Sequence, residues 1–537
     1  MSEQRRIEIY DTTLRDGTQG EGFNLSLQDK LAIAQKLDEL GVDYIEGGFP
    51  GSNEKDRAFF QDVRELKLKN AKICAFGMTR RRGVKAEDDP NMKALLDAQT
   101  PVVTLVGKTS DYQVKAVLNV TPEENLAMIA DSVALMRSAG RQVVYDAEHF
   151  FDTMRSNPQY AISTLIAAQE AGASVLCLCD TNGGTMPEQI AEAVAQVKKQ
   201  TSARIGIHTH NDAGLAIANA LSAIRAGAAH AQGTINGVGE RCGNMDLLPL
   251  IANLRLKYNL DCLREDSLKR LTEVSRYVYE TANMNLSPGQ PYVGSSAFAH
   301  KGGMHVQAVQ KDVSTYEHVS PEEVGNSRRI LISELSGVSN IANKAGRKFD
   351  LENDKTTLRN VLEQVKNLEN QGYQFEAAEA SFELLLRREI GRYQRFFELD
   401  YYRVSVLKQT GGPAVSEATV KLRVGSTVEH RVAEGDGPVN ALDGALRRAL
   451  RPHYAAIERV HLIDYKVRVI NSKDETAASV RVVIECRRTS PNGAKETFGT
   501  IGVSQNIIDA SWQALVDAYE YHLIHEQEAT EAATPGQ

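Results

Sequence analysis

The sequence predicts an α/β fold whose N-terminal part is a (β/α)8 barrel. Eight short apolar or β-branched segments alternate with stretches of helical periodicity, and several of these stretches end in a glycine suited to a helix C-cap. Near-continuous apolar strands separated by helices indicate a parallel sheet covered on both faces, and eight such units in about 250 residues match a closed barrel. A doubly wound sheet is the alternative, but no G-x-G-x-x-G turn follows the first strand.

The expected strands follow one another at regular intervals along the first half of the chain. They are residues 7–14, 42–48, 72–78, 102–108, 142–148, 175–181, 204–210 and 230–236. The clearest of the helices between them are expected at 26–41, 121–140 and 212–227.

The bulk composition indicates a multidomain globular protein. The chain has 537 residues, of which 42% are hydrophobic, and a formal net charge of −8, which argues against a nucleic-acid surface. We expect a cytoplasmic protein without membrane contact, because neither a signal-peptide core nor a run of about 18 apolar residues occurs. The six cysteines lack C-x-x-C spacing, which favours free thiols. The expected parts are a catalytic barrel, linker subdomains, a C-terminal domain and a disordered acidic tail: residues 1–280, 281–395, 396–525 and 526–537.

Polar side chains gather where the predicted strands end. In a parallel barrel these ends share one rim, and the loops of that rim build the active site. The residues concerned are Asp11, Arg15, Asp16, Glu46, Asp146, Glu148, Asp180, Thr181, His208 and His210.

Two histidines at the end of the seventh strand suggest a metal site. His208 and His210 are two residues apart in an extended segment, so they share a face. Barrel closure brings Asp16 near them, and Asn244 could add an oxygen. Nitrogen and oxygen donors without thiolate leave Zn²⁺, Mn²⁺, Co²⁺ and Mg²⁺ open. The alternative is a hydrogen-bonded cluster that braces the rim.

The other rim residues also have two interpretations. Arg15 would stabilise negative charge on a substrate oxygen, or it would simply pair with Glu46 or another carboxylate. Glu148 would act as a base or hold a substrate group, or it would pair with an arginine. The loop NGVGERCGN (236–244) lets backbone approach a ligand closely, although glycines also serve ordinary turns.

Three segments carry a resemblance to a known family. DTTLRDGTQGEG (11–22), HTHNDAGLAIANALSAIRAGA (208–228) and NGVGERCGN together resemble the signatures of the Claisen-condensing 2-isopropylmalate, homocitrate and citramalate synthases. EGGFPGSNEKD (46–56) and VGKTSDYQVKAVLNVTPEENLAMI (106–129) look most like the citramalate branch. The resemblance implies condensation of acetyl-CoA with pyruvate, hydrolysis of the thioester to citramalate and CoA, and a place in isoleucine biosynthesis.

The resemblance also implies roles for individual residues. A divalent metal would be held by Asp16, His208, His210 and Asn244, and Arg15 would contact the keto oxygen. The 2-oxo acid would be surrounded by Tyr145, Glu148 and Thr181. His305 and Tyr316 would be candidates for acid-base work. The loop that contacts CoA would contain Gly237, Gly239 and Gly243.

The C-terminal part contains an internal repeat. Residues 437–450 and 503–519 share N-x-[LI]-D-[GA]-[AS], and strand-like segments precede each of them. Two units of a small sheet and a helix resemble the leucine-binding domain of isopropylmalate synthases, which implies isoleucine as effector here and a homodimer. The repeated polar residues Asn440, Asp443, Asn506 and Asp509 are the regulatory candidates. A dimerisation module without a ligand is the alternative.

Two other functions are compatible with the sequence. The first is another enzyme on the same barrel, such as an acyl-CoA lyase or a 2-isopropylmalate synthase with 2-oxoisovalerate as acceptor. The second is a non-catalytic amino-acid sensor, against which the intact Asp16, His208 and His210 argue.

Overall fold

The chain folds into two compact units. The computed structural model describes residues 5–331, 354–470, 478–490 and 495–533, together with residues 341, 349, 351 and 493. The first unit is Met1–Phe298 with His318–Arg328, and the second is Ala299–Glu317 with Arg329–Gln537. The division thus falls later than the expected boundary at residue 280, because 282–298 and 318–328 pack with the barrel.

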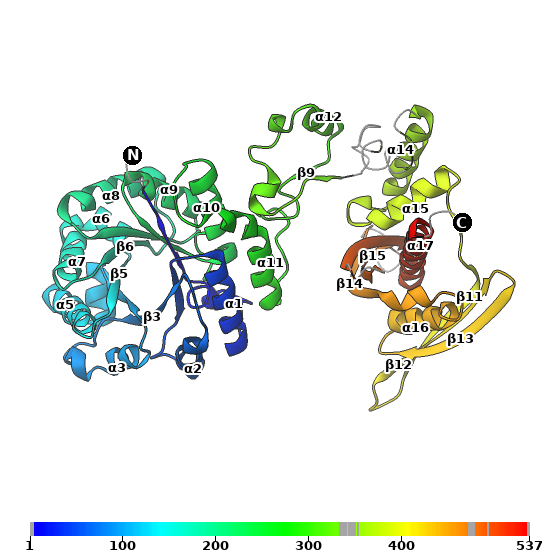
Figure 1. The fold of residues 1–537 in the computed structure, drawn as a ribbon. Coiled ribbons are helices and arrows are strands. Elements are labelled where there is room, and N and C mark those ends of the chain that lie inside the picture. The colour runs from blue at the N-terminus through cyan, green and yellow to red at the C-terminus, as the bar shows by residue number, and fades with distance from the viewer. Residues whose placement is uncertain are drawn as a thin grey trace. The chain divides into compact units, whose positions relative to one another are not determined.

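The first unit is a closed eight-stranded parallel barrel, as predicted (Figure 1). Its strands lie at all eight expected positions: β1 (Glu8–Asp11), β2 (Tyr44–Gly48), β3 (Lys72–Met78), β4 (Val102–Lys108), β5 (Gln142–Glu148), β6 (Val175–Asp180), β7 (Arg204–Thr209) and β8 (His230–Gly233). Parallel pairing of β1 with β8 closes the barrel. The ends of β1 and β7 therefore come together across a single intervening strand.

Helices surround the barrel in Figure 1. They are α1 (Leu27–Leu40), α2 (Glu54–Asp62), α3 (Pro90–Asp97), α5 (Pro122–Ser138), α6 (Phe150–Ser156), α7 (Pro158–Glu170), α8 (Pro187–Gln200), α9 (Ala216–Ala226), α10 (Leu247–Leu256) and α11 (Leu271–Thr281). Helix α1 shows why its start and end could be predicted from the sequence. Ser26 caps α1 in a reciprocal capping box with Asp29, and Gly41 ends it with a left-handed φ of 93°. The helix expected at 212–227 begins only at Ala216.

The barrel has two apolar layers. The larger fills the space between the sheet and the helices, and the smaller lies inside the barrel. The inner layer consists of Tyr10, Tyr44, Cys74, Val102, Val144, Val175, Cys177 and Cys179. Because successive strand residues point to opposite sides, each strand sends alternate side chains into these layers. This packed interior leaves the polar groups above it at the carboxyl ends of the strands.

The second unit starts with two short strands and three helices and ends with two copies of a sheet followed by a helix. The elements before the repeat are β9 (Ala299–His300), α12 (Gly303–Lys311), β10 (Arg329–Ile330), α14 (Lys355–Asn370) and α15 (Glu379–Glu389). The repeat consists of two three-stranded antiparallel sheets, each followed by a helix. The first half is β11 (Glu398–Lys408), β12 (Ala414–Val424), β13 (Thr427–Gly435) and α16 (Pro438–Leu450). The second half is β14 (Val460–Val469), β15 (Val480–Thr489), β16 (Lys495–Ser504) and α17 (Ile507–Ala533).

The expected disordered tail is wrong for residues 526–533. α17 continues through Ala533, and residues 534–537 lie outside the described part. The segment is rich in Glu, Gln and Ala, which favour helix, and two of its three glutamates form ion pairs. Glu528 forms an ion pair with Arg387 at 2.7 Å, and Glu526 pairs with Arg459. Among the described residues, no helix has both the length and the apolarity that crossing a bilayer requires.

Glu520 of α17 makes stability depend on pH. Its side chain is 1% exposed, accepts a hydrogen bond from Tyr393 and lies 3.8 Å from Arg388. Burial raises its pKa to about 7, so the folded chain keeps a proton that the unfolded chain releases near pH 4.5. The contribution of Glu520 to the free energy of unfolding should therefore fall as pH rises from about 4.5 to about 7, and change little above.

We expect Glu520→Gln to be more stable than the parent at pH 8, by up to about 3 kcal/mol, and nearer to it at pH 5. Urea unfolding of both proteins at the two pH values measures this difference. Glu192→Gln, at an exposed position in the middle of α8, serves as control and should shift neither curve. An equal effect of Glu520→Gln at both pH values would contradict the assignment.

Candidate functional site

The carboxyl ends of the barrel strands surround a cavity of about 310 Å³. Most of the predicted rim residues face it: Arg15, Asp16, Asp146, Glu148, Thr181, His208 and His210. They come from β1, β5, β6 and β7 or from the residues that directly follow these strands. The barrel thus brings together side chains that are up to 195 residues apart in the sequence. Active sites of this fold lie at this end of the barrel.

Asp16, His208 and His210 form a compact buried cluster. The two Nε2 atoms of the histidines lie 3.3 Å apart, and Asp16 Oδ2 lies 3.3 Å from His208 Nε2. One ligand atom from each residue lies within 4.8 Å of the others. Burial, followed by the charge of His208, lowers the pKa of His210 to about 4, so this imidazole is neutral near pH 7. Burial would raise the pKa of Asp16, but Arg15 and the histidines lower it well below its usual range.

Asn244 joins the cluster through a backbone bridge to His210. Its Oδ1 atom is buried and has no hydrogen-bond partner among the described residues, and the same holds for His210 Nδ1. A buried amide oxygen without a partner is costly unless something absent from the chain binds it. Two imidazoles, a carboxylate and this oxygen fit a divalent cation, as the sequence predicts.

The glycine-rich loop holds Asn244 in place. Gly243 has a φ of +89°, and a Cβ atom there would lie 2.0 Å from the carbonyl oxygen of Gly237. A Cβ atom at Gly239 would lie 2.1 Å from Asn244 Nδ2. The glycines are therefore required by the loop itself. Contact between this loop and CoA stays a prediction.

A hydrogen-bond chain orients His208 from below. His208 Nδ1 lies 2.9 Å from Gln232 Oε1, and Gln232 Nε2 donates to Asp146 Oδ1 at 2.9 Å. Since the amide oxygen can only accept, Nδ1 carries a proton, and Nε2 is the nitrogen that faces Asp16 and His210 and is the one available to a cation. Burial and the charge of Glu46 raise the pKa of Asp146 to about 7. Gln232 is thus a positioning residue that sequence reasoning missed, because an amide inside a strand carries no motif.

We expect Gln232→Leu to lower the affinity for the catalytic cation by about 10- to 100-fold, because His208 loses its orienting partner. Saturating metal should restore most of the rate. Calorimetric metal titration measures the change, and Gln142→Leu, at the other end of the barrel, is the matched control. An unchanged dissociation constant in Gln232→Leu would refute the orienting role.

Arg15 pairs with Glu46, as one of its two sequence-based interpretations predicts. Its Nε donates to Glu46 Oε2 at 2.6 Å, and Tyr10 donates to the other oxygen of Glu46 at 2.7 Å. The guanidinium also stacks on Phe76, 3.9 Å from the ring centre, and lies 3.5 Å from Asp16. Burial would lower the pKa of Arg15, but Glu46 and Asp16 raise it. Glu46 therefore holds a permanent cation against the wall of the cavity.

Glu148 and Thr181 line the same cavity. Glu148 forms an ion pair with Lys108 at the end of β4 rather than with an arginine. The Thr181 hydroxyl accepts a hydrogen bond from the backbone of His149 at 2.8 Å.

Arg241, in the glycine-rich loop, adds a cation to the wall and pairs with Asp212 at 2.8 Å. Sequence reasoning named neither Lys108 nor Arg241, because lysine and arginine beside turns are common on any surface.

Tyr145 is wrongly predicted as a substrate contact. It precedes Asp146 on β5 and points to the opposite side of the sheet, into the layer between strands and helices. Its side chain is fully buried there. The ring packs so closely on Gly107 that a Cβ atom at that glycine would lie 2.7 Å from it. It is therefore a packing residue. The period-two alternation of the strand excludes it once Asp146 and Glu148 face the cavity.

His305 and Tyr316 belong to the second unit. Their rings stack with centroids 4.2 Å apart and planes at 28°. The sequence resemblance named the two separately, and their stacking is a finding of the structure. Their role in acid-base chemistry stays a prediction.

Two of the four regulatory candidates line a cavity in the C-terminal repeat. Asn440 and Asp443 face a space of about 530 Å³ together with Arg447, His461 and Tyr465. The other two do not line it. Asn506 caps α17 by accepting from Ile508 N at 2.8 Å, and Asp509 accepts from Gln513 at 3.0 Å.

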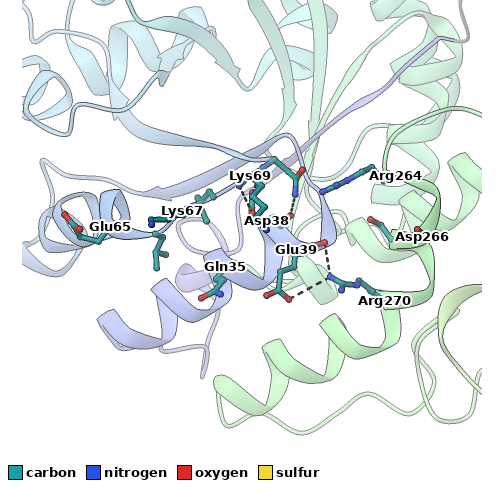
Figure 2. A pocket seen from close by; sticks show the side chains of 13 residues that line it. Gln35, Asp38, Glu39, Glu65, Lys67, Lys69, Arg264, Asp266 and Arg270 are labelled. Carbon is teal, nitrogen blue, oxygen red and sulfur yellow. Dashed lines mark hydrogen bonds and ion pairs between the residues drawn. The ribbon is translucent and has the colours of Figure 1, made fainter.

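A further cavity of about 530 Å³ lies at the amino ends of the strands (Figure 2). Asp38, at the end of α1, accepts hydrogen bonds from the backbone of Lys69, Asn70 and Ala71 in the loop before β3. Arg270 donates to the carbonyl of Glu39, as Figure 2 also shows. These contacts tie loops to helices, and this face of the barrel usually serves stability. The chemistry therefore belongs to the opposite end.

Three family models match successive parts of the chain: the barrel, the segment after it and the C-terminal repeat. Residues 6–278 match the HMGL-like model, 292–373 the homocitrate synthase post-HMGL domain-like model and 376–523 the LeuA allosteric (dimerisation) domain. Fold and site together define an HMGL-like barrel enzyme with a LeuA-type domain.

Relatives over the full length narrow the class. The chain is 51% identical to (R)-citramalate synthase of Geobacter sulfurreducens, over 98% of this chain and 99% of the relative. It is 49% identical to (R)-citramalate synthase of Aquifex aeolicus, over 97% and 99% of the two chains. Identity to 2-isopropylmalate synthase of Methanocaldococcus jannaschii is 30%, over 95% and 94%. The chain belongs to the (R)-citramalate synthase family.

Proposed function

We propose that this protein condenses acetyl-CoA with pyruvate and hydrolyses the thioester to give (R)-citramalate and CoA. The observation that supports this most is the buried Asp16–His208–His210 cluster beside Arg15, in a chain that resembles (R)-citramalate synthases from end to end. In this reaction the methyl group of acetyl-CoA loses a proton, its carbon bonds to the keto carbon of pyruvate, and water then releases CoA.

Four residues would hold the catalytic cation: Asp16, His208, His210 and Asn244. A bound Mn²⁺, Mg²⁺, Zn²⁺ or Co²⁺ supplies Lewis-acid polarisation of a carbonyl. Arg15 would stabilise the negative charge that develops on the keto oxygen, because Glu46 fixes its guanidinium at the cavity wall. Glu148 and Thr181, which line the same cavity, would contact the 2-oxo acid.

His305 and Tyr316 are the candidates for proton transfer. His305 and Tyr316 would supply an acid or a base, and their stacking keeps an imidazole beside a phenol. Gly237, Gly239 and Gly243 would let the loop backbone approach CoA, although their primary role is to shape the loop.

The proposal is tested by product analysis after metal removal and readdition. Protein stripped with a chelator should form neither citramalate nor free CoA from acetyl-CoA and pyruvate, and Mn²⁺ or Mg²⁺ should restore both products. Chiral chromatography should detect the (R)-enantiomer. Full turnover without metal would refute the site, and no turnover under any metal would favour the non-catalytic sensor.

We further propose isoleucine as an inhibitory effector and a homodimer as the active assembly. The match to a LeuA allosteric (dimerisation) domain supports both, and the cavity beside Asn440 and Asp443 has room for an amino acid. Initial rates with isoleucine or leucine test the effector, and light scattering tests the assembly. Stronger inhibition by leucine would favour the 2-isopropylmalate synthase alternative.

A further inference from the structure

A second group of metal-ligating side chains lies inside the barrel. Cys177 and Cys179 are two residues apart on β6, so they share its inner face, and Asp146 lies on the neighbouring strand β5. One carboxylate oxygen and the two sulfur atoms all lie within 4.8 Å of one another. All three side chains are buried, and none of them belongs to the Asp16–His208–His210 cluster.

The group is connected to the substrate cavity. Asp146 and Cys179 line that cavity, while Cys177 belongs to the apolar layer beneath it. A small cation that enters the cavity therefore meets a carboxylate and a thiol first and the second thiol behind them.

The contacts of the two thiols are weak hydrogen bonds, which they make with each other, with Asp146 and with a backbone carbonyl. The sulfur of Cys179 contacts the carbonyl oxygen of Cys177 at 3.8 Å, and the Cys177 thiol is hydrogen-bonded to Cys179 and Asp146. Asp146 Oδ1 accepts a hydrogen bond from Gln232 Nε2, and Gln232 Oε1 accepts one from His208 Nδ1. Buried cysteines are usually packing residues, but a carboxylate oxygen within 4.8 Å of both sulfur atoms adds a chelating set at the top of the apolar layer.

We propose that Asp146, Cys177 and Cys179 form a second cation site, selective for soft divalent ions such as Cd²⁺ and Zn²⁺. Two thiolates with one carboxylate favour such ions over Mg²⁺ and Mn²⁺, which prefer oxygen donors. Each thiol that binds loses its proton to solvent, and no oxidation occurs. Occupation draws Asp146 toward the cation and so disturbs Gln232 and His208, which inhibits the enzyme; this consequence rests on the proposed function.

The experiment is a Cd²⁺ titration of the full-length protein, preloaded with Mn²⁺ and carrying Cys242→Ser to remove the exposed thiol. Thiolate-to-Cd²⁺ charge transfer absorbs in the ultraviolet, whereas Cd²⁺ bound by nitrogen and oxygen atoms alone does not give this band. We expect the band to saturate at one equivalent. Its absence would overturn the proposal whether or not the protein turns over citramalate.

Two cysteine variants in the same background separate this site from other thiols. Cys177→Ala should lose the band. Cys74→Ala is the matched control, because Cys74 is buried in the same inner layer but belongs to no such group among the described residues, and it should keep the band. A band of unchanged amplitude in Cys177→Ala would overturn the assignment. Circular dichroism of both variants confirms that the barrel is folded.

Activity recorded in the same titration tests the inhibitory consequence. The rate should fall in parallel with the growth of the band and should recover when a thiol chelator removes Cd²⁺. A full rate at a saturated band would overturn the inhibition, whereas a protein that binds Cd²⁺ but never turns over would count against the proposed function alone.

Discussion

His208→Ala is expected to lower kcat/KM by about 10³-fold or more while the barrel stays folded. The substitution removes one of two imidazoles that converge with Asp16, and the cation supplies several kcal/mol of transition-state stabilisation. His208 lies at the end of β7 beside the cavity, and its ring contacts polar groups rather than the apolar core. The melting temperature should therefore change little, and metal content measured on the purified protein should fall with the rate.

His230→Ala is the matched control for this prediction. His230 is also a buried imidazole on a barrel strand, but its Nδ1 lies 3.4 Å from Glu8 at the other end of the barrel. The control should retain bound metal even if its stability falls. A His208→Ala protein with full metal content and full rate would show that the ligand assignment is wrong.

Arg15→Met is expected to reduce both stability and activity. Glu46 is fully buried, and without Arg15 its charge keeps only the Tyr10 hydroxyl among the partners described above. Removing one member of a buried ion pair costs about 3–5 kcal/mol, and losing a donor to developing negative charge lowers kcat by about 10²- to 10³-fold. Urea unfolding and steady-state rates measure the two effects separately.

The double variant Arg15→Met, Glu46→Gln separates the two roles. A neutral amide still accepts from Tyr10 and leaves no unpaired charge, so most of the lost stability should return. Activity should stay low, because no cation replaces the guanidinium. Recovery of activity together with stability would mean that Arg15 acts only as the structural partner of Glu46.

The fold could be predicted because its determinants are local and repeated. Each barrel strand is a short apolar segment, and each helix between strands has recognisable ends, as Ser26 and Gly41 show for α1. The third strands of the C-terminal sheets, β13 and β16, escaped prediction. Each contains only a few apolar residues at irregular spacing among polar and charged ones, so the period-two hydrophobic signal of a strand is weak.

The site was predictable only where residue type and strand position agree. His208 and His210 share a face by strand geometry, and the rim position of Asp16 follows from barrel closure. Gln232 and Lys108 depend on contacts between strands far apart in the sequence, which composition does not reveal. Tyr145 was assigned from the resemblance, and the alternation of β5 places it on the packing side instead.

Initial rates of CoA release from acetyl-CoA, measured over a panel of 2-oxo acids, test the central claim most directly. The panel contains pyruvate, 2-oxobutyrate, 2-oxoisovalerate and 2-oxoglutarate at saturating Mn²⁺. Pyruvate should give the highest kcat/KM, and chelation should abolish the rate with every acid. A clear preference for 2-oxoisovalerate, or an undiminished rate after chelation, would contradict the assignment of this protein as a metal-dependent enzyme that condenses acetyl-CoA with pyruvate.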